Sequence, residues 1–495
     1  MPDHPIANGN LHTIRLQILV VVGVLGVFYV VGHSQLAQNI VWGSQAATKD
    51  RSRERIEPET TANTEEWNGA CGIDKHGPPK RAVRACITEY GGVGDGRTLN
   101  TAAFQKAIAA LANIEGGAQL HVPAGHWLTG CFNLTSHLTL YLERGALILG
   151  SQNTQDWPLI EPLPSYGSGR ERPGKRHTSL LHGKGLVDIW ITGDNGTIDG
   201  QGGMWWEMWK NRTLVHTRGH LLEFISSQNI VLSNVVLRNS PFWTVHPVYC
   251  NNLMVKNVTI LAPWDAPNTD GIDPDSSSNV CIEDCYISNG DDLVSIKSGW
   301  DEYGLQVARP SINITVRRVI GTTATCSGIS IGSEVSGGIE NVLVEDLLVF
   351  NAAAGIRLKT APGRGGYVKN VTIKNVKFQR VKRAIEFSGD AGEHPKDVGG
   401  GGGLGSSLSD FSKYTAVAGI FIQNVVGTNI VYPGRFISTP QAPFVDICLF
   451  NISLDAVSSW SCSFVHGSSS SVIPPLCPPL ASFISTSASC NLMYP

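Results

Sequence analysis

Short runs in which apolar, mostly β-branched residues alternate with polar ones recur along the central part of the chain. The intervals between their first residues are 23, 27, 34, 28 and 29 positions, and the runs begin at Asn229, Asn252, Asn279, Asn313, Asn341 and Asn370. A period of two predicts strands, and strand units that recur every 20–50 residues are typical of a solenoid. Because units this short leave little room for crossover helices, the pattern favours an all-β fold, a single right-handed parallel β-helix.

The chain divides into four predicted segments. They are a signal peptide or signal anchor (1–34), a polar linker (35–70), the β-helix domain (71–457) and an irregular tail rich in Cys, Ser and Pro (458–495). The clearest helical pattern is TAAFQKAIAAL at 101–111, which predicts a short N-terminal helix that caps the open strand edge. A Pro/Gly-rich stretch (154–178) and the glycine run Gly399–Gly403 predict long loops.

An apolar run at Ile18–Val31 follows Arg15 near the N-terminus. Its 14 residues suit the core of a signal peptide and are short for a spanning helix, although residues 16–31 could also remain as an uncleaved membrane anchor. Both alternatives bring the main body into the secretory pathway. N-linked glycans are expected there, because N-x-S/T sequons occur at Asn133, Asn195, Asn211, Asn257, Asn313, Asn370 and Asn451.

The overall charge excludes some partners. The formal net charge is −3 and no basic run occurs, so no nucleic-acid partner is expected. The 11 cysteines include Cys281 and Cys285, but no second pair or histidine cluster with metal-ligand spacing follows them. We therefore expect neither a metal nor another cofactor, and we expect a monomer.

Two acidic clusters carry the candidate chemistry. They are NTDGID, which contains Asp270, and NGDD, which contains Asp291 and Asp292. Since adjacent parallel strands lie roughly 4.8 Å apart, one coil of separation should stack Asp270 close to Asp291. Clustered carboxylates repel one another and raise at least one pKa, which provides a protonated acid beside an ionised base. Either cluster alone would more often be a turn that ends a coil.

Two cations follow downstream in the sequence RLK. Arg357 and Lys359 are two positions apart, so on a strand they share one face and could together bind the carboxylate of an acidic sugar. A solvated strand edge is the alternative for this pair. His246 in PFWTVHP could line the cleft or be a structural histidine, and Trp243 and Trp264 could stack on sugar rings or pack in the core.

The motifs NTDGID, GDD, ISIGSE and RLK occur in an order that closely resembles family 28 glycoside hydrolases, the polygalacturonases. Further segments match this family, namely VGDGRTLNTAAFQKAI, GTIDGQG and NSPFWTVHP, so the resemblance covers roughly Tyr90 to Leu454. The extension GSEVSGG is most similar to plant members and to exo-acting bacterial members. Endo and exo action both remain open.

The resemblance implies a pectin-lyase-like right-handed β-helix and hydrolysis of α-1,4-linked galacturonan, a pectic polysaccharide, with inversion. By motif position Asp291 corresponds to the general acid, and Asp270 and Asp292 correspond to the pair that activates water. Arg357 and Lys359 correspond to the binders of the substrate carboxylate. Asn268 and His246 are added as candidate substrate-binding residues. Stacked carboxylates about 5 Å apart would by themselves suit a retaining enzyme, but the motif match is the more specific signal.

One motif departs from the family pattern. Ser327 stands where the family has a histidine, in a Gly-His-Gly motif before ISIGS, and serine carries no charge near neutral pH. An inactive pectin-binding relative is therefore the first rival function. A Ca²⁺-dependent pectate lyase is the second, and hydrolysis of a rhamnose-containing pectin backbone is a close variant.

Overall fold

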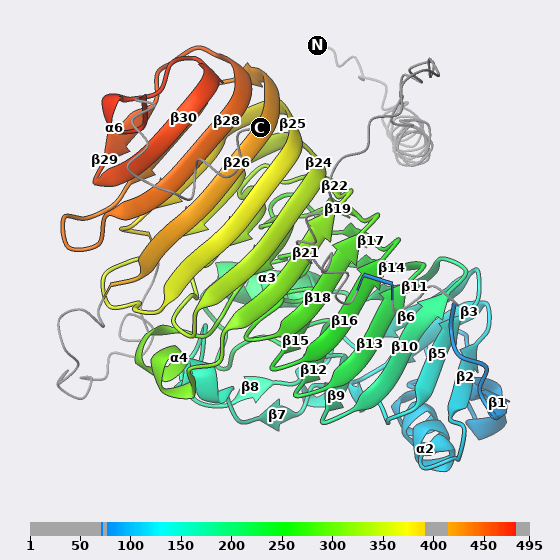
Figure 1. The fold of residues 1–495 in the computed structure, drawn as a ribbon. Coiled ribbons are helices and arrows are strands. Elements are labelled where there is room, and N and C mark those ends of the chain that lie inside the picture. The colour runs from blue at the N-terminus through cyan, green and yellow to red at the C-terminus, as the bar shows by residue number, and fades with distance from the viewer. Residues whose placement is uncertain (1–70, 73–76, 392–413, 482–495) are drawn as a thin grey trace, which may run out of the picture. The chain divides into compact units, whose positions relative to one another are not determined.

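A computed structural model describes residues 71–72, 77–391 and 414–481 of the 495-residue chain (Figure 1). The predicted signal segment 1–34, the linker 35–70, the glycine run Gly399–Gly403 and the end of the predicted tail (482–495) lie outside the described residues. In the described ranges, no helix has both the length and the hydropathy that crossing a membrane requires.

Strands dominate the described chain, and the helices are few and short. The helices are η1 (Ile87–Tyr90), α2 (Thr101–Leu111), η2 (Thr154–Asp156), η3 (Pro164–Tyr166), α3 (Gly203–Lys210), α4 (Asp301–Val307) and α6 (Pro478–Ala481). The strands of the first half are β1 (Val83–Cys86), β2 (Ala118–Val122), β3 (Gly125–Thr129), β4 (Phe132–Asn133), β5 (Leu138–Leu142), β6 (Ala146–Gly150), β7 (Leu159–Ile160), β8 (Arg176–His177), β9 (Leu181–Lys184), β10 (Val187–Gly193), β11 (Gly196–Asp199), β12 (Leu222–Ile225), β13 (Gln228–Ser233), β14 (Val235–Arg238) and β15 (Val245–Val248). Those of the second half are β16 (Asn251–Lys256), β17 (Thr259–Leu261), β18 (Ser278–Glu283), β19 (Tyr286–Ser288), β20 (Val294–Ile296), β21 (Ser311–Arg317), β22 (Ile320–Thr322), β23 (Ser327–Ile331), β24 (Ile339–Lys359), β25 (Tyr367–Ser388), β26 (Ala416–Ile430), β27 (Tyr432–Ile437), β28 (Phe444–Ala456), β29 (Ser461–Ser463) and β30 (Val465–Ile473).

Each coil of the chain stacks on the next through parallel strands (Figure 1). In one wall β13 pairs with β16, β16 with β18 and β18 with β21, all in parallel register. The register aligns Ile230, Leu253, Val280 and Ile314, which are at most 1% exposed and form an aliphatic column inside the coils. Since crossovers between parallel strands are right-handed in nearly all proteins, the predicted right-handed parallel β-helix is confirmed.

The asparagines that begin the predicted runs lie at corners between coil walls. Their backbone φ angles are 53–60°, in the left-handed region that asparagine tolerates better than β-branched residues. Their side chains form a ladder along the solenoid, in which Asn341 donates to Asn313 at 3.2 Å and Asn370 to Asn341 at 2.6 Å. The repeat in the sequence is therefore a repeat of corners as well as strands.

Two boundaries differ from the sequence-based expectation. The run from Asn229 to Leu237 forms two strands, β13 and β14, because the chain turns a corner at Asn234, where φ is 53°. The tail expected to be irregular from residue 458 contains β29 and β30, and β30 pairs in parallel with β28. The solenoid thus continues to Ile473, and the serine run Ser468–Ser471 is part of its last strand.

Helix α2 forms over the predicted residues. It lies at the N-terminal end of the stack beside β1 and β2 (Figure 1). Its buried face includes Phe104, which stacks on Phe132 of β4 with ring centroids 4.5 Å apart. Its role as a cap stays a prediction.

Candidate active site

One wall of the solenoid carries polar side chains on its outward face. Ile272 bridges Val245 of β15 and Val294 of β20 in parallel, so the segment around Asp273 lies between these strands. The wall continues through β23 and β24, where Ser330 aligns with Arg357. The inward positions of this wall are aliphatic and buried, which leaves the polar positions to form the site.

The two acidic clusters meet on this wall, as their spacing predicted. Gly271 N donates to the carbonyl oxygen of Asp292 at 3.0 Å, and Asn289 Nδ2 donates to the carbonyl oxygen of Thr269 at 2.8 Å. These bonds hold Asp270 beside Asp291 and Asp292. The close stacking of coils therefore brings together carboxylates that the sequence separates.

Asp292 is held in its ionised form. Its side chain is fully buried, Lys359 Nζ lies 2.8 Å from its Oδ2, and the Ser327 backbone N–H donates to its Oδ1 at 2.9 Å. The Ser327 hydroxyl donates to the same oxygen. Burial alone would raise the pKa of Asp292, but the Lys359 charge and the bonds from Lys359 and Ser327 lower it to about 2.

The neighbouring carboxyls are shifted in the opposite direction. Burial and the charge of Asp291 raise the pKa of Asp270 to about 7. Burial and the charge of Asp292 raise the pKa of Asp291. Burial also raises the pKa of Asp273, whose carboxyl oxygens have no hydrogen-bond partner in the described part of the chain. The cluster thus combines one carboxylate whose pKa is lowered with three carboxyls whose pKa values are raised.

A buried lysine that the motifs did not reveal lies at the centre of this cluster. Lys297 is 3% exposed, and its Nζ is 3.4 Å from both Asp270 Oδ2 and Asp273 Oδ1 and 3.5 Å from Glu334 Oε2. The same nitrogen lies 4.4 Å from the ring centroid of Trp243. The sequence held one signal that could have revealed Lys297: this lysine follows the apolar Val294 and Ile296 at a position that alternation places on the outward face.

The predicted substrate-binding cations have partners of their own. Arg357 and Lys359 flank the buried Leu358 on β24, as expected for positions that share the outward face. Lys359 contacts Asp292, and Arg357 Nε lies 3.4 Å from Glu386 Oε2. Both side chains remain partly exposed, at 17% for Lys359 and 26% for Arg357.

The two other candidate substrate-binding residues differ in burial. His246 is fully buried, with Nδ1 3.0 Å from Glu223 Oε1 and Nε2 3.3 Å from Asp275 Oδ2. Asn268 is half-buried, and its Oδ1 accepts a bond from Arg218 at 2.8 Å. His246 is thus a satisfied internal histidine in this structure, and its contribution to substrate binding stays a prediction.

The two tryptophans considered for stacking lie in different environments. Trp243 is 3% exposed and packs edge-on against His246, with ring centroids 4.9 Å apart. Trp264 is 67% exposed, on the segment that leads into Asn268. Only Trp264 presents an open ring face to a polymer in solution.

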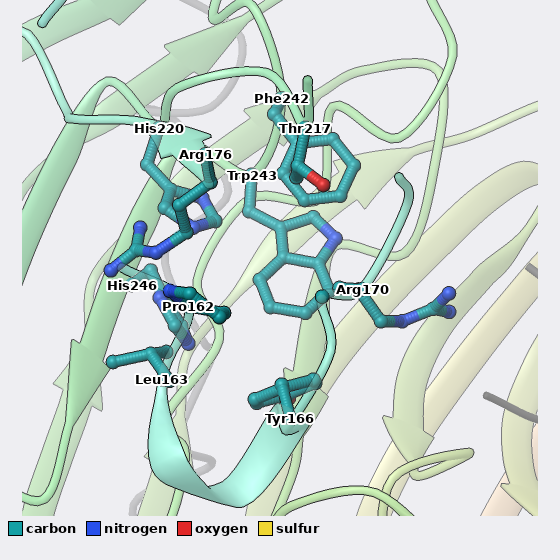
Figure 2. Close-up of a pocket in the computed structure, with 11 residues that line it drawn as sticks. Pro162, Leu163, Tyr166, Arg170, Arg176, Thr217, His220, Phe242, Trp243 and His246 are labelled. Carbon is teal, nitrogen blue, oxygen red and sulfur yellow. The ribbon is translucent and has the colours of Figure 1, made fainter. Parts of the chain in front are cut away.

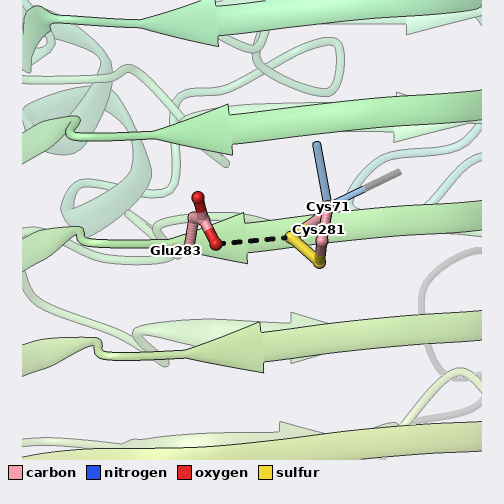
Figure 3. A group of neighbouring side chains, drawn as sticks. All are labelled: Cys71, Cys281 and Glu283. Atoms are coloured by element: carbon pink, nitrogen blue, oxygen red, sulfur yellow. Dashed lines mark hydrogen bonds between the residues drawn. A yellow bond between two sulfur atoms is a disulfide. The ribbon is translucent and has the colours of Figure 1, made fainter. Parts of the chain in front are cut away.

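Three groups of side chains in the described ranges could supply metal ligands. In the first, Cys281 is disulfide-bonded to Cys71 beside Glu283 (Figure 3), so its sulfur is not a free thiolate. The second is His220, Glu223 and His246, where the Arg176 guanidinium is 2.9 Å from Glu223 and repels cations. The third is Asp291, Asp292 and Cys326, inside the catalytic cluster.

Comparisons with known proteins agree with this geometry. The model of the family "Glycosyl hydrolases family 28" matches residues 118–392. A probable polygalacturonase from Vitis vinifera is 46% identical over 404 residues, 80% of each chain. An endo-polygalacturonase from Pectobacterium parmentieri is 29% identical over 74% of this chain and 87% of its own length. Among solved structures, the exopolygalacturonase of Thermotoga maritima matches with a TM-score of 0.68 at 26% identity, over 82% of this chain and 96% of that one. Since the family match spans more than half of the chain and the Vitis relative resembles four fifths of it, the chain belongs to family 28 of the glycosyl hydrolases.

Proposed function

We propose that the protein is a polygalacturonase that hydrolyses α-1,4-galacturonosyl bonds of pectic polysaccharide with inversion. The observation that carries this proposal is the carboxylate cluster itself. It combines a carboxylate held ionised, with a pKa of about 2, and neighbours whose pKa values are raised. Glycoside hydrolysis by two carboxyls needs this separation, since one group must donate a proton while another activates water.

The roles are those that the family motifs imply, and the charges of the cluster support them. Asp291, whose pKa is raised by burial and by the charge of Asp292, donates its proton to the glycosidic oxygen of the leaving group. Asp292 is ionised and accepts a proton from the attacking water, and Asp270 helps to orient that water. Water then attacks the anomeric carbon from the face opposite the leaving group, which inverts the configuration.

The cations on β24 favour an acidic substrate. Lys359 and Arg357 project from one face of the strand beside the carboxylates, where they could hold the carboxylate of a uronate. Lys359 contacts Asp292 as well, so the same side chain would couple substrate binding to the state of the base. A neutral rhamnose unit at the cleaved position would offer these cations no charge in addition to those of Asp292 and Glu386.

Ser327 favours an active enzyme over an inactive binding protein. Its backbone N–H and hydroxyl both donate to Asp292, and these bonds stabilise the ionised base. The histidine of the family pattern is absent, but the carboxylate of Asp292 still receives hydrogen bonds from the protein. We therefore expect turnover, with a pH profile that depends on carboxyls alone.

The nature of the product tests the proposal. Purified protein is incubated with polygalacturonate, with and without a Ca²⁺ chelator, while new reducing ends and ultraviolet absorbance are both followed. A hydrolase releases reducing ends without absorbance and is insensitive to the chelator. A lyase produces an unsaturated uronate that absorbs in the ultraviolet, and an inactive binder produces neither signal. Sizing the products then distinguishes endo from exo action.

We further propose that the enzyme acts outside the cell, in the plant cell wall, as an N-glycosylated monomer. The sequon asparagine Asn211 is exposed in the structure, which supports glycan attachment. Treatment with an endoglycosidase, followed by mass measurement, tests the glycans.

A further inference from the structure

The wall that carries the catalytic cluster continues over the later coils of the solenoid. Parallel pairing runs from β20 through β23, β24 and β25 to β27. Its register aligns Arg357 of β24 with Glu386 of β25, and Glu386 with Arg435 of β27. Since successive coils lie roughly 4.8 Å apart, this row of outward positions leads from the site toward the C-terminal coils.

Three arginines converge on the carboxylate of Glu386. Arg383 Nη1 donates to its Oε1 at 2.9 Å, and Arg435 Nε donates to the same oxygen at 2.8 Å. Arg357 Nε lies 3.4 Å from the other oxygen, Oε2. Glu386 is itself 3% exposed. It therefore holds the guanidinium groups of Arg383 and Arg435 near the coil of β25, one coil past Arg357.

This arginine cluster has an excess of positive charge that is open to solvent. Arg435 Nη2 donates to Ser388 Oγ at 2.7 Å, and this hydroxyl donates to Asp390 at 3.1 Å. Even with Asp390 counted, the three guanidinium groups face two carboxylates. The side chains of Arg383 and Arg435 are 27% and 35% exposed. Among the described nitrogen atoms of the cluster, only Arg357 Nε is both closed to solvent and without a hydrogen-bond partner. The unpaired N–H groups of Arg383 are therefore accessible to an anion.

An aromatic ring lies beside these guanidinium groups. Tyr432, at the start of β27, aligns with Arg383 in the parallel register. Its ring centroid is 5.4 Å from the guanidinium carbon of Arg383, and the residue is 40% exposed. A uronate unit combines an apolar ring face with a carboxylate, so an exposed ring next to cations suits it.

The cations on the side of the earlier coils are enclosed instead. Figure 2 shows a small cavity beside Trp243, lined by Arg170 and Arg176 from the loop that carries η3 and β8. Arg176 is 5% exposed and lies 2.9 Å from Glu223. Arg170 lies 2.7 Å from Glu334. Each of these two cations thus has a buried carboxylate of its own, whereas the arginines on the later coils share Glu386.

We propose that Arg383 and Arg435 bind the carboxylate of the galacturonate unit next to the one held by the cations on β24, on the side of β25 and β27. The proposal rests on the proposed function, because the ligand is part of the same acidic polymer. A polymer that lies along this wall advances by roughly one coil for each sugar unit. Glu386 is the positioning residue of this subsite. Affinity would then depend on free acids at two neighbouring units.

The test uses the full chain with Asp291→Asn, which prevents turnover, and calorimetric titration with hexagalacturonate at about 0.05 M and about 0.5 M NaCl. Arg435→Gln and Arg383→Gln each remove one guanidinium group and keep a polar side chain. We expect each to weaken binding about tenfold at low salt, the effect of losing a charged hydrogen bond. The loss should be smaller at high salt, because exposed charges are screened. Arg318→Gln is the matched control, since Arg318 is also 35% exposed and pairs with Asp284 beside β21, in another wall.

Unchanged affinity in both variants would overturn the proposal. A loss that is equal at the two salt concentrations would also overturn it, because the arginines would then act only through the packing of the wall. Should Arg435→Gln fail to fold, as judged by its melting temperature, Arg383→Gln decides by the same criteria.

The assay of the parent chain separates this proposal from the proposed function. Hydrolysis of polygalacturonate by the parent, with unchanged affinity in both variants, removes the subsite and leaves the function intact. A salt-sensitive loss of binding in the variants of a parent that does not hydrolyse the polymer supports the subsite and removes the function. A parent that neither hydrolyses the polymer nor binds hexagalacturonate overturns both.

Discussion

Replacing Lys359 with methionine should raise the pH at which activity is lost on the acidic side. Methionine keeps the length and much of the packing of the lysine but removes the charge that lies 2.8 Å from Asp292. Asp292 is fully buried, and burial favours its protonated form. Without Lys359 the base therefore takes up a proton at a higher pH.

The size of the effect follows from the pKa of Asp292. The shift from the ordinary value of 3.8 to about 2 is worth about 2 kcal/mol, at about 1.4 kcal/mol for each pH unit. Because the folded-state pKa is depressed, this stabilisation is present above pH 3.8 and is lost as the pH falls through about 2. When one partner of a buried ion pair is removed by mutation, proteins typically lose about 3–5 kcal/mol of folding stability. This figure includes the cost of leaving the other charge buried and unpaired. We expect the variant to lose between about 2 and 5 kcal/mol of folding stability at pH 6.

The assay is the pH dependence of kcat/KM on polygalacturonate between about pH 2.5 and 8, combined with urea unfolding at pH 6. At pH 4 Asp292 should be almost wholly ionised in the parent enzyme. A return of its pKa to 3.8 would leave only about 60% ionised, and burial would reduce this further. Lys369→Met is the control, because Lys369 pairs with Glu340 on an exposed surface at 2.6 Å.

Two results would refute this reasoning. One is an acidic limb at the same pH in the parent and in Lys359→Met. The other is a loss of stability as large in the Asp292→Asn background as in the parent, since Lys359 would then act independently of Asp292. An effect confined to KM at all pH values would assign Lys359 to substrate binding alone.

Three further predictions concern the same cluster. Asp291→Asn should reduce kcat by several orders of magnitude without changing the melting temperature, because an amide cannot protonate the leaving oxygen; near-normal turnover would remove Asp291 from its role. The parent enzyme should be most active in mildly acidic solution and lose kcat/KM as the pH rises, since Asp291, whose pKa is raised, then gives up the proton that the leaving oxygen needs, and Asp270, whose pKa is raised to about 7, ionises beside it; an optimum above neutrality with Ca²⁺ dependence would favour the lyase. Ser327→Ala should shift the acidic limb upward by less than Lys359→Met does, because it removes one hydrogen bond to Asp292 and keeps the backbone donor; an unchanged acidic limb would contradict this.

The sequence by itself determined the repeating wall of the fold. Alternating β-branched residues specify strands, and an asparagine at each corner specifies the left-handed backbone that lets the next strand begin. The helix at Thr101–Leu111 was also readable, since its apolar residues recur at helical spacing. These features depend on neighbours within a few residues. The corner at Asn234, which divides one predicted run into two strands, was not distinguished from a strand residue because polar residues also occupy the outward positions.

The acidic motifs were likewise readable, and their meeting was predictable from the spacing of coils. Only the tertiary structure decided what surrounds them. Lys297 reaches Glu334 across 37 positions of sequence, and Arg170 reaches the same carboxylate across 164. The cavity beside Trp243 combines a loop and two coils in the same way. Such contacts form where the stacked coils and the covering loop bring side chains face to face. The burial that results then sets the pKa of each group. Neither the contacts nor the burial can be worked out from a single segment of the chain.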